Sequence, residues 1–104
     1  MPYDGALVLQ YLQKSHETSL LTEREKHLLG LAVTMTRGCQ VCTRGRIEKA
    51  RQAGINDDVL NALVDLVAAV NAGVSAATAR EGFRLAAPHE PCGDMCSPAV
   101  AVVR

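Results

Sequence analysis

One stretch of this chain is apolar almost all the way around a helix, and it restricts what the chain can fold into. In residues 59–74, VLNALVDLVAAVNAGV, the polar residues Asn61 and Asp65 are one helical turn apart and nearly all the others are apolar. A helix of this kind needs cover on most of its sides. A chain of 104 residues with four other predicted helices offers little cover. We therefore expect a subunit interface here, and a central core helix in a monomer is the alternative.

The start and stop signals along the chain predict an all-α fold of about five helices. Thr22 followed by Glu25 is the pattern of a capping box, which opens a helix. Gly54 fits the residue after a helix C-terminus, and Asn56 fits the N-cap of the next helix. No strand pattern and no internal repeat precedes the last few residues. The predicted helices cover residues 5–15, 22–36, 39–53, 56–71 and 75–86.

Small and cyclic residues set the expected boundaries near the C-terminus. Gly73 fits the end of the fourth predicted helix, and Ser75 fits the cap of the fifth. Three prolines, Pro88, Pro91 and Pro98, make a helix after residue 87 unfavourable. We therefore predict a helical domain over residues 1–87 and a non-helical tail over residues 88–104.

Charge and composition exclude several classes of partner. The formal net charge is zero and no basic block is present, so we expect neither nucleic acid nor an anionic membrane as a partner. No apolar run approaches the length that is needed to span a bilayer. The first residues lack the basic start and cleavage pattern of a secretory signal. The expected location is the cytoplasm.

The motif Cys39-Gln40-Val41-Cys42 lies where one predicted helix ends and the next begins. In a helix, Cys39 and Cys42 lie one turn apart on the same side, within reach of a short-loop disulfide. Unpaired N–H groups and the positive end of the helix dipole favour a thiolate in the first turn. In a reducing compartment, paired cysteines are more often catalytic or metal-binding than structural. A redox-active dithiol is the leading interpretation.

The order of elements around this motif resembles the carboxymuconolactone decarboxylase-like family, and specifically its alkylhydroperoxidase D-like branch. The matching segments are LTEREKHLLGLAVTMTRGCQVC and KARQAGINDDVLNALVDLVAAV. The resemblance implies an all-helical fold, a homo-oligomer that is a trimer or a hexamer, and thiol-dependent peroxidase or disulfide reductase activity. It implies no organic cofactor, because electrons come from an external dithiol.

Two positions depart from that branch. Its redox members have a Glu twelve residues before the first Cys and a His four residues after the second, where this chain has His27 and Arg46. Arg46 can stabilise a thiolate but cannot transfer a proton, whereas His27 can do so near neutral pH. The hypothesis is that both act at the dithiol, with Cys42 as nucleophile and Cys39 as resolving thiol. The alternative is a solvated Arg46 and an ordinary polar-face histidine.

The tail carries a second cluster, His89, Cys92 and Cys96. Three interpretations remain open: a second redox pair that passes electrons to the first, ligands for zinc, or cysteines without a particular role. The predicted function is a thiol-disulfide oxidoreductase that reduces a peroxide or a protein disulfide. The alternatives are a non-catalytic module that binds zinc or iron or supports assembly, and a decarboxylase-like enzyme.

Overall fold

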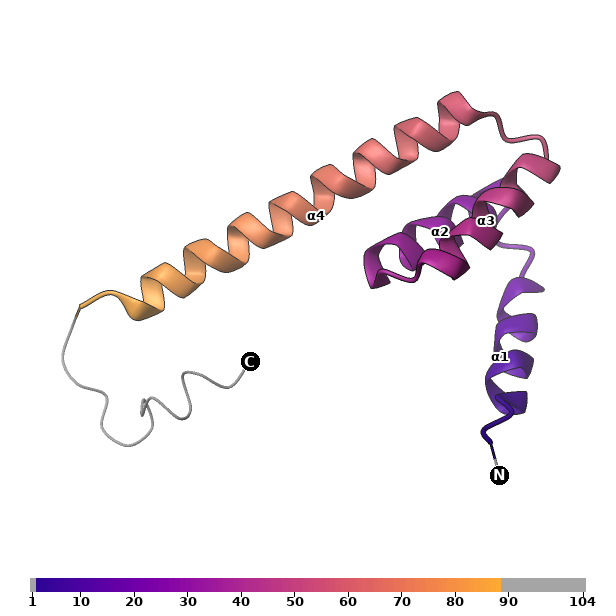
Figure 1. Ribbon diagram of the computed structural model, residues 1–104, viewed down its shortest axis with the longest axis horizontal. Helices are drawn as coiled ribbons and strands as arrows, with labels where there is room; N and C mark the ends of the chain where they lie inside the picture. The colour runs from indigo at the N-terminus through magenta and orange to yellow at the C-terminus, as the bar shows by residue number, and fades with distance from the viewer. Residues whose placement is uncertain (1, 89–104) are drawn as a thin grey trace. The chain divides into compact units, whose positions relative to one another are not determined.

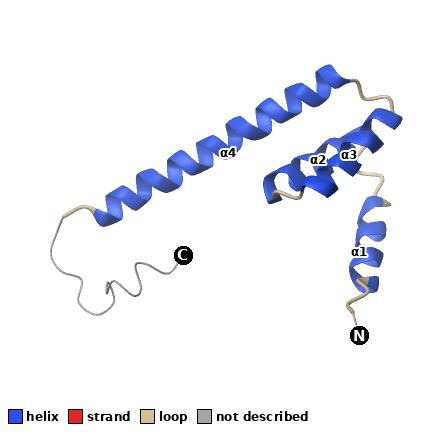
Figure 2. Cartoon of the chain, in the orientation of Figure 1, coloured by secondary structure: helices blue, strands red, loops and turns tan. Residues whose placement is uncertain are grey.

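The computed structural model describes residues 2–88 and confirms the all-α class (Figure 1). Figure 2 shows helices and loops, and no strand, in these residues. The predicted non-helical tail covers residues 88–104, and all of it except Pro88, including the cluster of His89, Cys92 and Cys96, lies outside the described part of the chain. The helices are α1 (Ala6–His16), α2 (Glu23–Arg37), α3 (Gln40–Gln52) and α4 (Asp57–Ala86).

Local signals in the sequence mark four of the observed helix boundaries. Thr22 and Glu25 form the complete capping box at the start of α2. Gly38 and Gly54 follow α2 and α3 with φ angles of 81° and 88°, a left-handed conformation that glycine adopts without a Cβ penalty. The Asn56 side chain accepts a hydrogen bond from the N–H of Val59 at 3.1 Å, which caps α4.

The expected break at Gly73 does not occur, and the described residues contain four helices rather than about five. One continuous helix, α4, replaces the last two predicted helices. Gly73 does not have a positive φ, so it does not end the helix. A single glycine costs a helix interior only about 1 kcal/mol relative to alanine, and the alanines and other apolar residues around it favour continuation.

The chain divides into two units, residues up to Ala72 and residues from Gly73 onward. In the first unit, α2 and α3 pack side by side as a helical hairpin (Figure 1). Four hydrophobic side chains are buried there, and partly buried neighbours such as Met35 and Ile47 extend the cluster. The buried residues are Leu31, Ala50, Ile55 and Leu60. The described part of the second unit, residues 73–88, is exposed throughout.

Because α4 is continuous, it has a long apolar stretch that neither of the two shorter predicted helices had. By length and composition alone, the 30-residue helix Asp57–Ala86 is apolar and long enough to cross a membrane. Little of its most apolar stretch is buried within the chain. Leu66, Val70 and Val74 are 64%, 57% and 60% exposed. The helix therefore presents apolar surface that the described residues leave uncovered.

Candidate functional site

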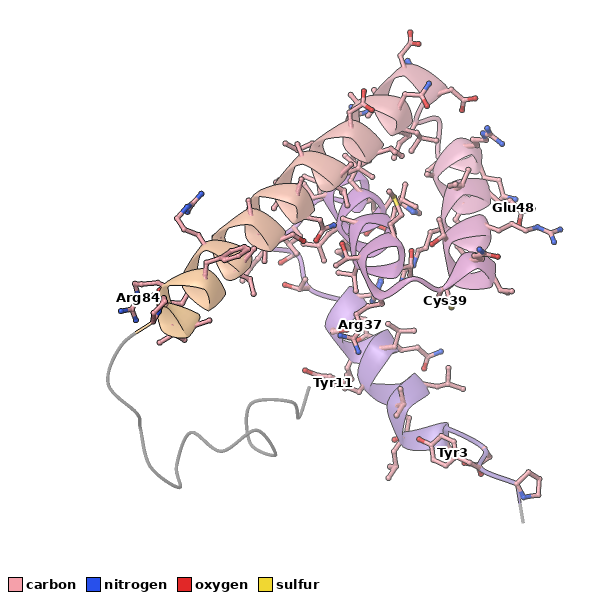
Figure 3. The ribbon with its side chains drawn as sticks, turned by 60° about the vertical axis from the view of Figure 1, so that its left-hand side comes forward. Tyr3, Tyr11, Arg37, Cys39, Glu48 and Arg84 are labelled. Atoms are coloured by element: carbon pink, nitrogen blue, oxygen red, sulfur yellow. A yellow bond between two sulfur atoms is a disulfide. The ribbon has the colours of Figure 1, made fainter. Side chains whose placement is uncertain are left out.

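Cys39 lies between the end of α2 and the start of α3, where the chain reverses direction (Figure 3). The left-handed Gly38 makes this reversal, and the N–H of Cys39 donates to the carbonyl of Thr34 at 3.1 Å. Cys39 is the N-cap residue of α3 and Cys42 lies in its first turn. The backbone geometry of the helix start thus determines where both sulfurs lie.

Cys39 and Cys42 form a disulfide, and their Cα atoms are 5.3 Å apart. This separation lies in the usual range for disulfides. The sulfur of Cys39 also accepts a hydrogen bond from the backbone N–H of Cys42 at 3.1 Å. Cys39 is half-buried, whereas Cys42 is exposed. Of the two sulfur-bearing residues, Cys42 is therefore the more accessible to a molecule arriving from solvent.

A shallow hollow of about 500 Å³ opens beside Cys39. Its walls combine apolar side chains of the hairpin with polar residues at the start of α3. The Arg44 side chain is one of these polar residues and pairs with Glu48 at 3.3 Å. We call this space the cysteine hollow; its lining is Met35, Gly38, Cys39, Gln40, Thr43, Arg44 and Ile47.

His27 and Arg46 line one hollow together, although they come from α2 and α3. Its volume is about 290 Å³, and neither cysteine contributes to it. Both side chains are half-buried. The structure thus brings His27 and Arg46 to a shared space and joins Cys39 to Cys42, but the hollow beside Cys39 is a different one from the hollow that His27 and Arg46 line.

Positively charged and titratable nitrogens predominate in the space that His27 and Arg46 share. We call it the cationic hollow. Its single carboxylate, Glu23, lies 3.0 Å from the amine of Lys26, and the hydrogen bond from Lys26 lowers the pKa of Glu23. The complete lining is Leu12, Gln13, His16, Glu23, Lys26, His27, Arg46 and Lys49.

Arg46 extends from α3 across α2 at Gly30. Its Cζ lies 2.6 Å from the position that a Cβ on Gly30 would occupy, so only glycine leaves room for the guanidinium there. Gly30 is an interior helical glycine that was not predicted to have a role from the sequence. A glycine in the middle of an otherwise good helix was the available signal, since such a residue often marks a close approach.

Lys49 and Arg44 were also not recognised as candidates from the sequence. Lys49 lies three residues after Arg46 on α3, a spacing that places the two on one helix face and was readable in the sequence. Arg44 lies two residues after Cys42, a spacing that does not predict its place in the cysteine hollow. Among residues 2–88, no three His, Cys, Asp or Glu side chains lie together as a potential metal site.

The fold and the site define an all-α protein whose α2–α3 hairpin carries a Cys-x-x-Cys disulfide at a helix start. Residues 5–87 match the carboxymuconolactone decarboxylase family. The match covers most of the chain, so this protein belongs to that family. No curated protein and no solved structure matches the chain in the corresponding searches.

Proposed function

We propose that this protein is a thiol-disulfide oxidoreductase of the alkylhydroperoxidase D-like type, which reduces a peroxide or a protein disulfide. The observation that carries the proposal is the disulfide between Cys39 and Cys42 at the start of α3. Membership in the carboxymuconolactone decarboxylase family is compatible with this activity. A dithiol that closes within one helical turn needs no large rearrangement to cycle between its two redox states.

In the proposed reaction, the Cys42 thiolate attacks one oxygen of the peroxide and the O–O bond breaks. The leaving oxygen takes up a proton and departs as an alcohol or water, and Cys42 becomes a sulfenic acid. Cys39 then attacks the Cys42 sulfur, a water molecule leaves, and the disulfide forms. An external dithiol returns two electrons and two protons. With a protein disulfide as substrate, a mixed disulfide replaces the sulfenic acid.

The exposure of Cys42 and the position of Arg46 support Cys42 as the nucleophile. Cys42 is exposed, whereas Cys39 is half-buried and its sulfur accepts the Cys42 N–H. The start of α3 favours a thiolate at Cys39 as well, since Cys39 is the N-cap residue. The choice of Cys42 therefore depends on its exposure and on Arg46 one helical turn later. We propose Cys39 as the resolving thiol.

His27 and Arg46 have subsidiary roles in this proposal. Arg46 places a permanent positive charge one helical turn after Cys42, which favours the thiolate. His27 supplies a group that can transfer a proton near neutral pH. Arg46→Gln should raise the pKa of the Cys42 thiol, whereas His27→Gln should mainly slow turnover. The pH dependence of the alkylation rate and of peroxide consumption separates these two effects.

The central experiment follows the dithiol directly. The reduced protein is treated with one equivalent of peroxide, and the peptide that contains both cysteines is examined by mass spectrometry. We expect this peptide to lose two hydrogens in the wild type. We expect a trapped sulfenic acid in Cys39→Ser and no reaction at this peptide in Cys42→Ser. Over-oxidised single cysteines in the wild type would contradict the dithiol mechanism.

The other functions considered predict different outcomes for the same proteins. A decarboxylase-like enzyme would act on a small lactone acid equally well with both cysteines replaced by serine. A module that binds zinc or iron would carry stoichiometric metal after purification. No feature of residues 2–88 favours either function over the dithiol.

We also propose that the chain assembles into a homo-oligomer, a trimer or a hexamer by the family resemblance. The four buried hydrophobic side chains of residues 2–88 form a small core. The exposed apolar side chains of α4 offer a surface that other copies can cover. This accounts for the apolar length of α4 without a membrane.

A further inference from the structure

A second hollow adjoins the cationic hollow and differs from it in chemistry. The two share Leu12, His16, Lys26 and Arg46, so they are neighbouring parts of one depression in the first unit. The second has a volume of about 310 Å³ and is walled by leucines of α1, α2 and the segment between them, together with Val33. We call it the apolar hollow.

We propose that these adjoining hollows bind a small organic monocarboxylate with an unbranched apolar tail. The carboxylate would lie in the cationic hollow against Arg46, and the tail in the apolar hollow. Each hollow lies at the lower end of the size range of small-molecule sites. An apolar cavity with a few polar groups at one end is the usual design of such sites.

Arg46 is the group that points to an anion. Its guanidinium crosses α2 at Gly30 and lines both hollows. Within the described residues 2–88, the Arg46 side chain makes no ion pair or hydrogen bond. A half-buried guanidinium is partly desolvated, so a planar carboxylate that accepts two of its N–H bonds would be favoured.

The other charges around Arg46 also favour an anion. Glu23 is the one carboxylate in the cationic hollow, and Lys26 already neutralises it at 3.0 Å. Arg46 and Lys49 then remain as basic side chains without a carboxylate partner in this hollow. A ligand with an ammonium or an uncharged head would not pair with these basic side chains. We therefore exclude such a ligand as the preferred occupant.

The apolar hollow excludes the most hydrophilic anions as the preferred ligand. Leu21, Leu29 and Val33 line it and are 41%, 59% and 52% exposed in the chain alone. A bare phosphate or a short acid would leave these surfaces in water, whereas an alkyl tail would cover them. Each methylene placed there should improve affinity by about fourfold, the equivalent of about 0.8 kcal/mol.

The test is a titration of the full-length protein with octanoate, followed by calorimetry and by NMR shifts of residues in α2 and α3. Saturable binding with one site per chain is expected. Acetate and octanol should bind at least tenfold more weakly, and octylamine should not bind at this site. A series from butanoate to octanoate should show the stepwise gain in affinity.

Two variants connect binding to the proposed residues. Arg46→Gln should weaken octanoate binding by about 10- to 100-fold, because a charge-assisted hydrogen-bonded pair is lost. Arg24→Gln is the matched control, because Arg24 is an exposed arginine of α2 that lines neither hollow. The affinity of this variant for octanoate should equal that of the wild type. Gly30→Ala should also weaken binding, because the new methyl group displaces the guanidinium.

This proposal shares Arg46 with the proposed dithiol chemistry, but it does not need the cysteines, and the experiment keeps the two distinct. A Cys39→Ser/Cys42→Ser protein should bind octanoate with unchanged affinity. Three results would each overturn the proposal. They are an equal loss of octanoate affinity in Arg24→Gln and Arg46→Gln, equal binding of octanoate and octylamine, and the absence of saturable binding in folded protein. Circular dichroism of every variant excludes unfolding as the cause of lost binding.

Discussion

The sulfur of Cys39 accepts a hydrogen bond from the N–H of Cys42 while it is bonded to the sulfur of the same residue. One atom therefore takes part in the disulfide and caps the helix that carries its partner. The N-terminal N–H groups of a helix have no partner within the helix, and the N-cap side chain normally satisfies one of them. The redox motif and the start of α3 thus depend on the same residue.

Serine and alanine at position 39 should separate these two roles. Serine caps helices well, so in reducing buffer Cys39→Ser should be at least as stable as the reduced wild type. Cys39→Ala removes the cap and should lower the free energy of unfolding by about 1 kcal/mol relative to serine. Urea unfolding at one protein concentration measures both. Equal stability of the two variants would show that the sulfur does not cap α3 in the reduced protein.

Replacing each of two helical glycines with alanine should change the free energy of unfolding by different amounts. Nothing lies within 4 Å of a Cβ built on Gly45 in α3, so Gly45→Ala should stabilise the protein by about 0.5–1 kcal/mol. Gly30→Ala has the same gain in helix propensity but must displace the Arg46 guanidinium. We expect a smaller gain in the free energy of unfolding. Identical gains, with Arg46 unmoved in a crystal structure of Gly30→Ala, would contradict the observed packing.

The link between α3 and α4 should make stability depend on pH. Arg51 Nε donates to the Asp57 carboxylate at 2.9 Å, and this hydrogen bond lowers the pKa of Asp57. A carboxyl with a lowered pKa in the folded state stabilises the protein above its unfolded pKa and loses this effect as pH falls through the folded value. Asp57→Asn should therefore be less stable than the wild type at pH 7, and the difference should shrink below about pH 4.

The size of this effect should be small, because both side chains are more than half exposed, at 57% and 60%. Asp58→Asn is the matched control, since Asp58 lies in the same first turn of α4 and makes no ion pair in the described residues. Urea midpoints at pH 7 and at low pH measure both variants. A larger loss in Asp58→Asn than in Asp57→Asn would show that the helix dipole, and not the pair with Arg51, dominates.

The apolar surface of α4 predicts the oligomeric state. Leu66 is 64% exposed, and Leu66→Asp should break up the assembly, because a charge would be buried at the interface. Asp65→Asn, a change at the neighbouring polar position, should leave the assembly intact. Light scattering at micromolar concentration without detergent measures the mass of each protein. A monomeric wild type would contradict the interface, and a wild type that requires detergent would indicate a membrane instead.

Local signals in the sequence were sufficient for the all-α class and for most helix boundaries. The Thr22–Glu25 capping box, the left-handed Gly38 and Gly54, and the Asn56 cap each depend on residues within one or two turns of one another. Such interactions are readable from sequence because the backbone itself brings the partners together. The placement of Cys39 and Cys42 one turn apart is of the same kind.

Longer-range features required the tertiary structure. Gly73 is a typical helix-stop residue, yet α4 continues through it. The free-energy cost of one glycine is smaller than the stabilisation of the helix by the surrounding residues. The contact of Arg46 with Gly30 joins two helices, and no spacing along the chain predicts how they cross. That crossing places His27 and Arg46 in one hollow and Cys39 in another. The sequence alone determined which residues could do chemistry, and the packing of α2 against α3 decided which of them share a space.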